Sequence, residues 1–119
     1  MNFQLFLYSF FYALANVAGA ALIKKEIKLI GNLSSIDDYL KLLFKWRVVL
    51  GFIIIFVSAL ILFKALSIFD FSKIIPLSIG INFLLTAILG VFIFDEIINF
   101  YSSVGMLIII IGIVVLTLN

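Results

Sequence analysis

Cysteine and histidine are both absent from this chain of 119 residues. Without cysteine there is no disulfide, no thiolate metal site and no thiol nucleophile. Without histidine, the commonest general base and a frequent zinc ligand are missing as well. The remaining polar residues form no nucleophile–base pair, no metal-binding cluster and no phosphate-binding glycine loop in the sequence. We therefore expect no catalytic residue, no metal site and no cofactor.

Charge is also scarce. Only 12% of the residues are charged and 66% are hydrophobic, with a mean hydropathy of +1.43. A soluble domain is about a quarter charged, and a chain this small cannot bury so much apolar surface. The net charge of +2 comes without a basic stripe carrying stacking aromatic residues, so we expect no nucleic-acid partner. The composition predicts a protein that resides in lipid.

Four apolar runs are long enough to cross a bilayer core about 30 Å thick, which takes roughly 20 helical residues. They cover about residues 3–23, 48–66, 74–94 and 101–118. In lipid each backbone must satisfy its own hydrogen bonds, which forces helices. We predict an all-α integral membrane protein, one domain over residues 1–119, folded as a four-transmembrane-helix bundle. Pro76 is expected in the first turn of the third span. No basic residue precedes the first apolar run, so we interpret that run as a membrane span and not as a cleavable signal peptide.

The longest connection, residues 24–47, contains the segment SSIDDYLKLLFKW. Ser34 or Ser35, followed three residues later by Asp37 or Asp38, is typical of a helix N-terminus. Apolar residues then recur at helical spacing, with lysines left for the polar side. This pattern predicts a short interfacial helix in the first loop, or an aqueous extension of the second span.

Basic residues are concentrated in the first connection. They are Lys24, Lys25, Lys28, Lys41, Lys45 and Arg47. The third connection carries Asp95 and Glu96, interpreted as solvated turn charges, and no basic residue. Because basic loops favour the cytoplasm, we predict that loops one and three are cytoplasmic and that both termini are outside. High usage of isoleucine, phenylalanine and lysine is typical of an AT-rich genome, so we expect a multi-pass protein of the plasma membrane, the bacterial inner membrane.

Polar side chains inside the spans are costly, so each is a candidate site residue. In the first span, Tyr12 and Asn16 are four residues apart and share a helix face. This face either lines a polar cavity or supplies interhelical hydrogen bonds. In the third span, polar and small residues recur every four positions at Ser78, Asn82, Thr86 and Gly90. This stripe predicts either a substrate path opposite Asn16 or ordinary helix packing.

Lys64 lies near the end of the second span. Its ammonium group can hold a phosphate or carboxylate as a point charge, or reach water along its long side chain. Small residues at seven-residue steps predict helix packing or dimerisation faces in the second and fourth spans. These residues are Gly51 and Ser58 in the second span, and Gly105 and Gly112 in the fourth.

Two segments resemble known transporter families. The stretch ANVAGAALIKKE, from Ala15 to Glu26, is similar to the first helix of small multidrug resistance proteins. In that family a glutamate stands at the position of Asn16, and a lysine corresponds to Lys24. The glutamate is needed for proton-coupled cation export. Asn16 cannot ionise, which argues against that activity here.

The chain more closely resembles the EamA-like branch of the drug/metabolite transporter superfamily, especially the small subunits that flip aminoarabinose-phosphoundecaprenol. The resemblance is carried by AL…DFSKIIPL, from Ala65 to Leu77, by Asn82-Phe83, by the acidic turn Asp95-Glu96 and by the glycines Gly105 and Gly112. Ile74-Ile75 and Lys64 depart from the pattern of that family. The resemblance implies a four-helix membrane transporter. A single four-helix protomer is too thin to enclose a sizeable path, so we expect a dimer.

Three functions remain open. The first is a flippase or flippase subunit for an anionic lipid-linked substrate such as a polyprenyl-phosphate sugar. In it Asn16 and Asn82 line the path, Lys64 attracts the head group, and the partner is a second copy or a related four-helix protein. The second is a non-transporting scaffold that docks a membrane enzyme, such as a glycosyltransferase, through the first loop. The third is a small-multidrug-type exporter of cations.

Overall fold

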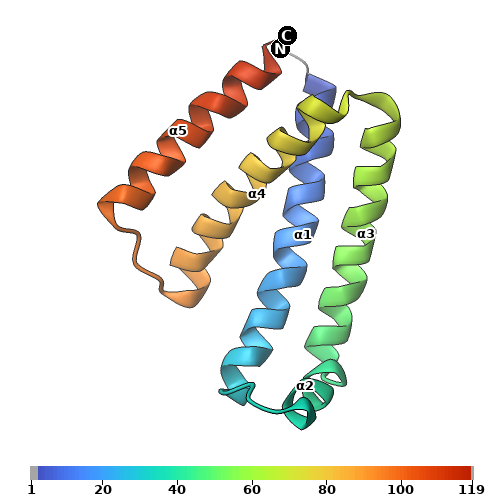
Figure 1. Ribbon diagram of the computed structural model, residues 1–119, viewed down its shortest axis with the longest axis vertical. Helices are drawn as coiled ribbons and strands as arrows, with labels where there is room; N and C mark the ends of the chain where they lie inside the picture. Colours follow the sequence, from blue (N-terminus) through green and yellow to red (C-terminus); the bar gives the residue numbers. More distant parts are fainter. Residues whose placement is uncertain (1–2, 119) are drawn as a thin grey trace.

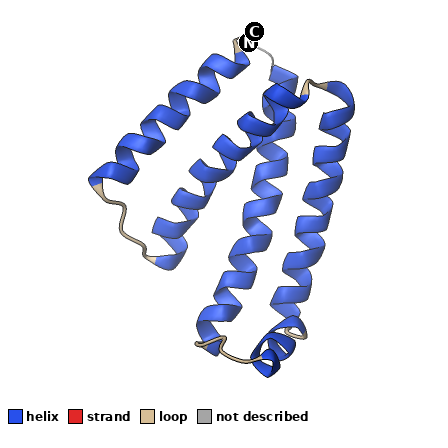
Figure 2. Ribbon diagram, in the orientation of Figure 1, coloured by secondary structure: helices blue, strands red, loops and turns tan. Residues whose placement is uncertain are grey.

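The computed structural model describes residues 3–118, and this part of the chain contains five helices and no strand. The helices are α1 (Phe3–Ile30), α2 (Ile36–Leu43), α3 (Trp46–Ile68), α4 (Phe71–Phe94) and α5 (Phe100–Thr117). Four of them, all except α2, are long and apolar enough to cross a membrane. The prediction of an all-α membrane protein with four spans and a short helix in the first loop is confirmed (Figure 2).

Two predicted boundaries differ from the structure. α1 continues past residue 23 to Ile30, because the charged segment that follows the predicted span contains no helix breaker. The next residue, Gly31, terminates the helix with a φ of +93°, which favours glycine. α4 begins at Phe71, so the expectation that Pro76 lies in the first turn is wrong. Pro76 lies in the second turn, where its missing N–H leaves the carbonyl of Ser72 without the usual helical partner.

α2 begins with the capping motif that the sequence suggested. Ser35 is the N-cap: its Oγ accepts a hydrogen bond from the backbone N–H of Asp38 at 3.3 Å, and Asp38 Oδ2 accepts one from the N–H of Ser35 at 3.3 Å. The N–H of Ser34 donates to the same carboxylate at 3.2 Å. The structure thus selects Ser35 over Ser34 and Asp38 over Asp37.

This cap should make α2 sensitive to acid. The backbone N–H of Ser34, together with Ser35, holds the pKa of Asp38 below its ordinary value. A lowered folded-state pKa stabilises α2 above the ordinary aspartate value of about 3.9, and this stabilisation is lost as the pH falls through the lowered pKa. The protection of the α2 amides against hydrogen exchange, measured relative to an unfolded peptide at the same pH, should therefore fall selectively under acid. Asp38→Asn should abolish this pH dependence, whereas Asp37→Asn should retain it.

The four long helices lie side by side in the order α5, α4, α1, α3 (Figure 1). The described chain measures 49 × 37 × 20 Å, so the bundle is a flat slab. α1 packs against α3 on one side and α4 on the other, whereas α5 contacts mainly α4. The connection containing α2 and the loop after α4 lie at one end, and the turn between α3 and α4 lies at the other (Figure 1).

The buried core lies toward the end of the bundle that contains the α3–α4 turn. Its members come mostly from the first half of α1, the end of α3 and the first half of α4; they are Leu5, Ala13, Ala65, Ile74, Leu77, Ile81 and Ile113. Beyond this core, α4 diverges from α1 toward its own C-terminus (Figure 1). Cavities lined by both helices lie in this region.

Close contact between α1 and α3 depends on two facing glycines. A methyl group at Gly19 would lie 2.6 Å from the carbonyl oxygen of Gly51, and one at Gly51 would lie 2.7 Å from that of Gly19. Ser58, on the same face of α3, is fully buried. In α5, by contrast, no described atom other than the adjoining helix backbone lies within 4 Å of where a side chain would begin at Gly105 or Gly112. Within residues 3–118, the fourth-span glycines therefore form no close contact with another helix.

Candidate substrate groove

A chain of hydrogen bonds joins three helices and is called the polar network below. Asn82 Nδ2 in α4 donates to Asn16 Oδ1 in α1 at 3.0 Å, and Asn16 Nδ2 donates to Ser58 Oγ in α3 at 3.4 Å. Ser58 Oγ in turn donates to the carbonyl of Ile55 at 2.5 Å, and Thr86 Oγ1 donates to Asn82 Oδ1 at 3.3 Å. Each of the two asparagines thus has both an oxygen and a nitrogen paired.

The polar network occupies the middle of the spans. Asn16, Ser58 and Asn82 each lie near the midpoint of their helices, so together they mark a single level of the bundle, away from both of its ends. A polar group at that depth is costly unless it is hydrogen-bonded. The interhelical hydrogen bonds that the sequence suggested for Asn16 are therefore present, and they hold α4 against α1.

One edge of the polar network is open to a groove between α1 and α4. This groove has a volume of about 330 Å³ and is lined by Tyr12, Ile79, Asn82, Phe83 and Thr86. It is called the α1–α4 groove below. Cavity lining and interhelical hydrogen bonding are thus compatible roles for the polar residues, because Asn82 and Thr86 form hydrogen bonds within the network and also line the groove.

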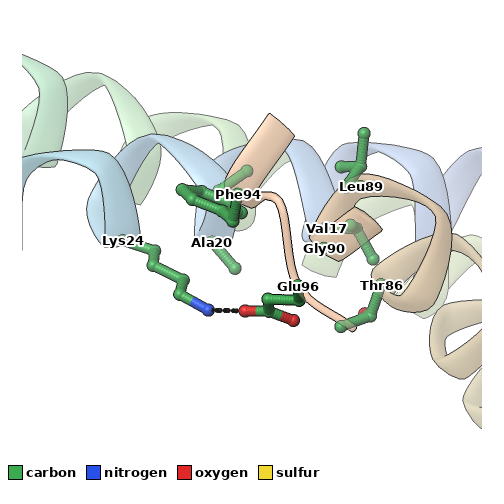
Figure 3. A pocket seen from close by; sticks show the side chains of 9 residues that line it. Val17, Ala20, Lys24, Thr86, Leu89, Gly90, Phe94 and Glu96 are labelled. Atoms are coloured by element: carbon green, nitrogen blue, oxygen red, sulfur yellow. Dashed lines mark hydrogen bonds and ion pairs between the residues drawn. The ribbon is translucent and has the colours of Figure 1, made fainter. Parts of the chain in front are cut away.

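Thr86 also lines a second, smaller cavity of about 100 Å³, which lies nearer the C-terminal end of α4. The charged side chains that line this cavity, Lys24 and Glu96, form an ion pair (Figure 3). The ammonium groups of Lys24 and Lys28 lie 4.8 and 5.1 Å from the centre of the Phe94 ring. These four residues, Lys24, Lys28, Phe94 and Glu96, are called the lysine cluster.

Glu96 is negatively charged in this setting. The hydrogen bond from Lys24 and the charge of that lysine, with a smaller contribution from Lys28, hold the pKa of Glu96 below its ordinary value. The lysine cluster therefore contains two ammonium groups and one carboxylate. The excess of positive charge favours an anion at this end of the groove.

A third cavity, of about 350 Å³, also lies between the second halves of α1 and α4. Its walls are apolar except at Lys25, and Val17, Ala21 and Leu89 line both this cavity and the one at the lysine cluster. The arrangement offers an apolar surface ending in lysines. Such a surface suits an amphipathic molecule with a hydrocarbon chain and an anionic head.

The structure brings some of the candidate residues together and leaves others apart. Tyr12, Asn16, Asn82 and Thr86 form the groove and its network. Ser78 is buried beside them, and its hydroxyl has no hydrogen-bond partner among the described residues. Lys64 is exposed on α3, beyond Ser58 toward the α3–α4 turn, and so lies toward the end of the bundle opposite the lysine cluster.

Two ion pairs were not anticipated from the sequence. Lys24 pairs with Glu96, and Arg47 Nη1 bonds the buried carboxylate of Glu26 at 2.9 Å, tying α1 to the start of α3. The sequence did contain one signal for the pair of Lys24 with Glu96, because four spans place loops one and three on the same side of the membrane. A carboxylate in loop three can therefore meet lysines that follow the first span.

No metal-binding group supplements the groove. Among residues 3–118, no cluster of three carboxylate, histidine or cysteine residues could hold an ion. The groove thus offers hydrogen bonds, apolar surface and positive charge, and these are means of binding. A comparison of the chain with protein-family models, with curated proteins and with solved structures found no match in any of the three.

Proposed function

We propose that this small multi-pass membrane protein is a flippase or flippase subunit for an anionic lipid-linked substrate, such as a polyprenyl-phosphate sugar. The observation that carries the proposal is the space between α1 and α4. It combines polar groups at mid-membrane, Asn82 and Thr86, with apolar walls and a lysine cluster at one end. A lipid head needs polar contacts on its way across, and its chain needs apolar surface.

A dimer is part of the proposal. The slab of helices leaves the α1–α4 groove open along its side, and one chain does not enclose a path. A second copy or a related four-helix protein would close it, as the paired halves of many transporters enclose a central site. We also propose that loops one and three are cytoplasmic, because the first connection is basic, and that the membrane is a bacterial inner membrane, because isoleucine, phenylalanine and lysine are abundant.

Asn82→Leu tests the path. The substitution removes a polar group from the groove wall and leaves Asn16 without its α4 partner. If the head group loses one polar contact in the path, worth about 1 kcal/mol, flipping should slow about fivefold. The measurement is transbilayer movement of a fluorescent polyprenyl-phosphate analogue in proteoliposomes. Ser78→Ala, buried outside the groove, is the control and should flip at the wild-type rate.

The role of Lys64 is tested in the same assay. Lys64→Met removes a charge from the end of α3 without touching the polar network. Slower flipping by a folded variant would support attraction of the head group, and an unchanged rate would remove Lys64 from the site. Absence of flipping by the wild-type protein, alone and with any co-purifying partner, would contradict the proposed function itself.

One observation favours a second candidate, the membrane scaffold. α2 and the residue after it expose a run of large apolar side chains: Ile36, Tyr39, Leu40, Leu43 and Phe44. These side chains suit either the membrane surface or a docked enzyme. Co-purification of an enzyme in fixed stoichiometry, with no flipping by the complex, would establish the scaffold instead.

A further inference from the structure

The cavity at the lysine cluster already holds an anion that belongs to the chain itself. Glu96 reaches back from the loop after α4 and pairs with Lys24 across the cavity (Figure 3). A phosphate-bearing ligand entering from this side would meet the same ammonium group. The carboxylate and the ligand therefore compete for one position.

The fold provides a place for this carboxylate. α4 ends with Asp95 in the left-handed conformation at φ 53°, and the N–H of Glu96 donates to the carbonyl of Gly90 at 2.9 Å. This turn directs the Glu96 side chain over the last turns of the helix. A methyl group at Gly90 would lie 2.5 Å from Glu96 Oε2, so the absence of a side chain at Gly90 makes room for the carboxylate.

The ion pair is weak enough to be displaced. The side chains of Lys24 and Glu96 are 46% and 49% exposed, and ion pairs in water-accessible positions contribute little. Among the described side chains, the Glu96 carboxylate bonds Lys24 alone, although Lys28 lies over the same Phe94 ring. A phosphate group has several oxygens and can accept from both lysines at once.

We propose that Glu96 is a built-in competitor that occupies the lysine cluster until the phosphate of an anionic lipid displaces it from Lys24. Displacement frees the loop between α4 and α5 from α1 and opens the cavity at the lysine cluster. The inference rests on the proposed function only for the identity of the ligand. The competition itself concerns binding, and it is measured without transport.

The test is a titration of the full chain in detergent with farnesyl phosphate, followed by native mass spectrometry. Farnesol, which lacks the anion, and inorganic phosphate, which lacks the chain, are titrated in parallel. Glu96→Gln removes the competitor and Gly90→Ala displaces it sterically, so both should bind farnesyl phosphate about two- to fivefold more tightly. Asp95→Asn removes the same charge from the neighbouring residue, which does not line the cavity, and should bind like the wild type.

Lys24→Gln should weaken binding, and Lys24→Arg should restore most of it. Unchanged or weaker binding by both Glu96→Gln and Gly90→Ala would overturn the competition. Equal binding of farnesol would overturn the anion site, and equal binding of inorganic phosphate would overturn the assignment to a lipid. If the variants rank as expected but no lipid flips in proteoliposomes, the proposed function fails while the competition stands.

A distance measurement tests the opening. The chain has no cysteine, so spin labels attach only where cysteines are introduced. Leu29 in α1 and Ile97 after α4 are 71% and 95% exposed and can accept labels without disturbing the core. Pulsed electron spin resonance should show a longer separation upon addition of farnesyl phosphate, and in Glu96→Gln without it. An unchanged separation in both cases would contradict displacement of the loop.

Discussion

Arg47→Met is expected to lower the free energy of unfolding by about 3 kcal/mol. The substitution leaves the carboxylate of Glu26 without its partner while its side chain remains only 9% exposed. Breaking a buried ion pair on one side is costly, because the remaining charge has lost both water and its counter-charge. The expected loss lies at the low end for such pairs, since the Arg47 side chain is 34% exposed.

The measurement is unfolding in mixed micelles of mild detergent and dodecyl sulfate, followed by circular dichroism. Glu26→Gln combined with Arg47→Met removes both charges and should recover part of the lost stability. Lys24→Gln removes one partner of the exposed pair with Glu96 and should change stability by less than about 1 kcal/mol. Equal losses for Arg47→Met and Lys24→Gln would show that burial of Glu26 does not matter.

Gly51→Ala should lower the free energy of unfolding by about 2 kcal/mol, because the new methyl group collides with backbone. It would lie 2.7 Å from the carbonyl oxygen of Gly19 and 2.8 Å from a side-chain carbon of Ile23. A side-chain end can turn away, but the carbonyl belongs to α1 and moves only with the helix. Gly19→Ala meets the mirror-image contact and should cost a similar amount.

Gly105→Ala and Gly112→Ala are the matched controls, measured by the same unfolding experiment. Both glycines lie in a helix with open space where a methyl group would stand, so alanine should be neutral or slightly stabilising in a monomer. A loss of dimer with unchanged monomer stability would identify their face as an interface between chains. A loss at Gly51→Ala no larger than at Gly112→Ala would contradict the close packing of α1 on α3.

Hydropathy predicted the number and approximate positions of the spans because lipid leaves the backbone no alternative to helix. It located the ends less well, since hydropathy reports contact with lipid and not the continuation of a helix. α1 therefore runs on to Ile30 through a charged segment, and α4 starts early enough to place Pro76 in its second turn. The cap of α2 was predictable because Ser35 and Asp38 interact within one turn.

The site was predictable only in part. Helical spacing placed Asn82 and Thr86 on one face and suggested that they lie opposite Asn16, as they do in the polar network. For Ser58, the seven-residue step from Gly51 predicted only helix packing. Its bond to Asn16 depends on how α3 rotates against α1, which spacing along one helix does not report. The pairing of Lys24 with Glu96 depends on a left-handed residue after α4, and spacing within a helix carries no information about such a turn.

The attachment of α5 to α4 has a consequence for the order in which the protein is assembled. The polar network draws only on α1, α3 and α4, and all three precede α5 in the chain and so leave the ribosome before it. The asparagines can thus find their partners before α5 enters the membrane. α5 then joins a finished three-helix unit along one side, and its lipid-facing surface stays accessible to whatever chain is inserted beside it.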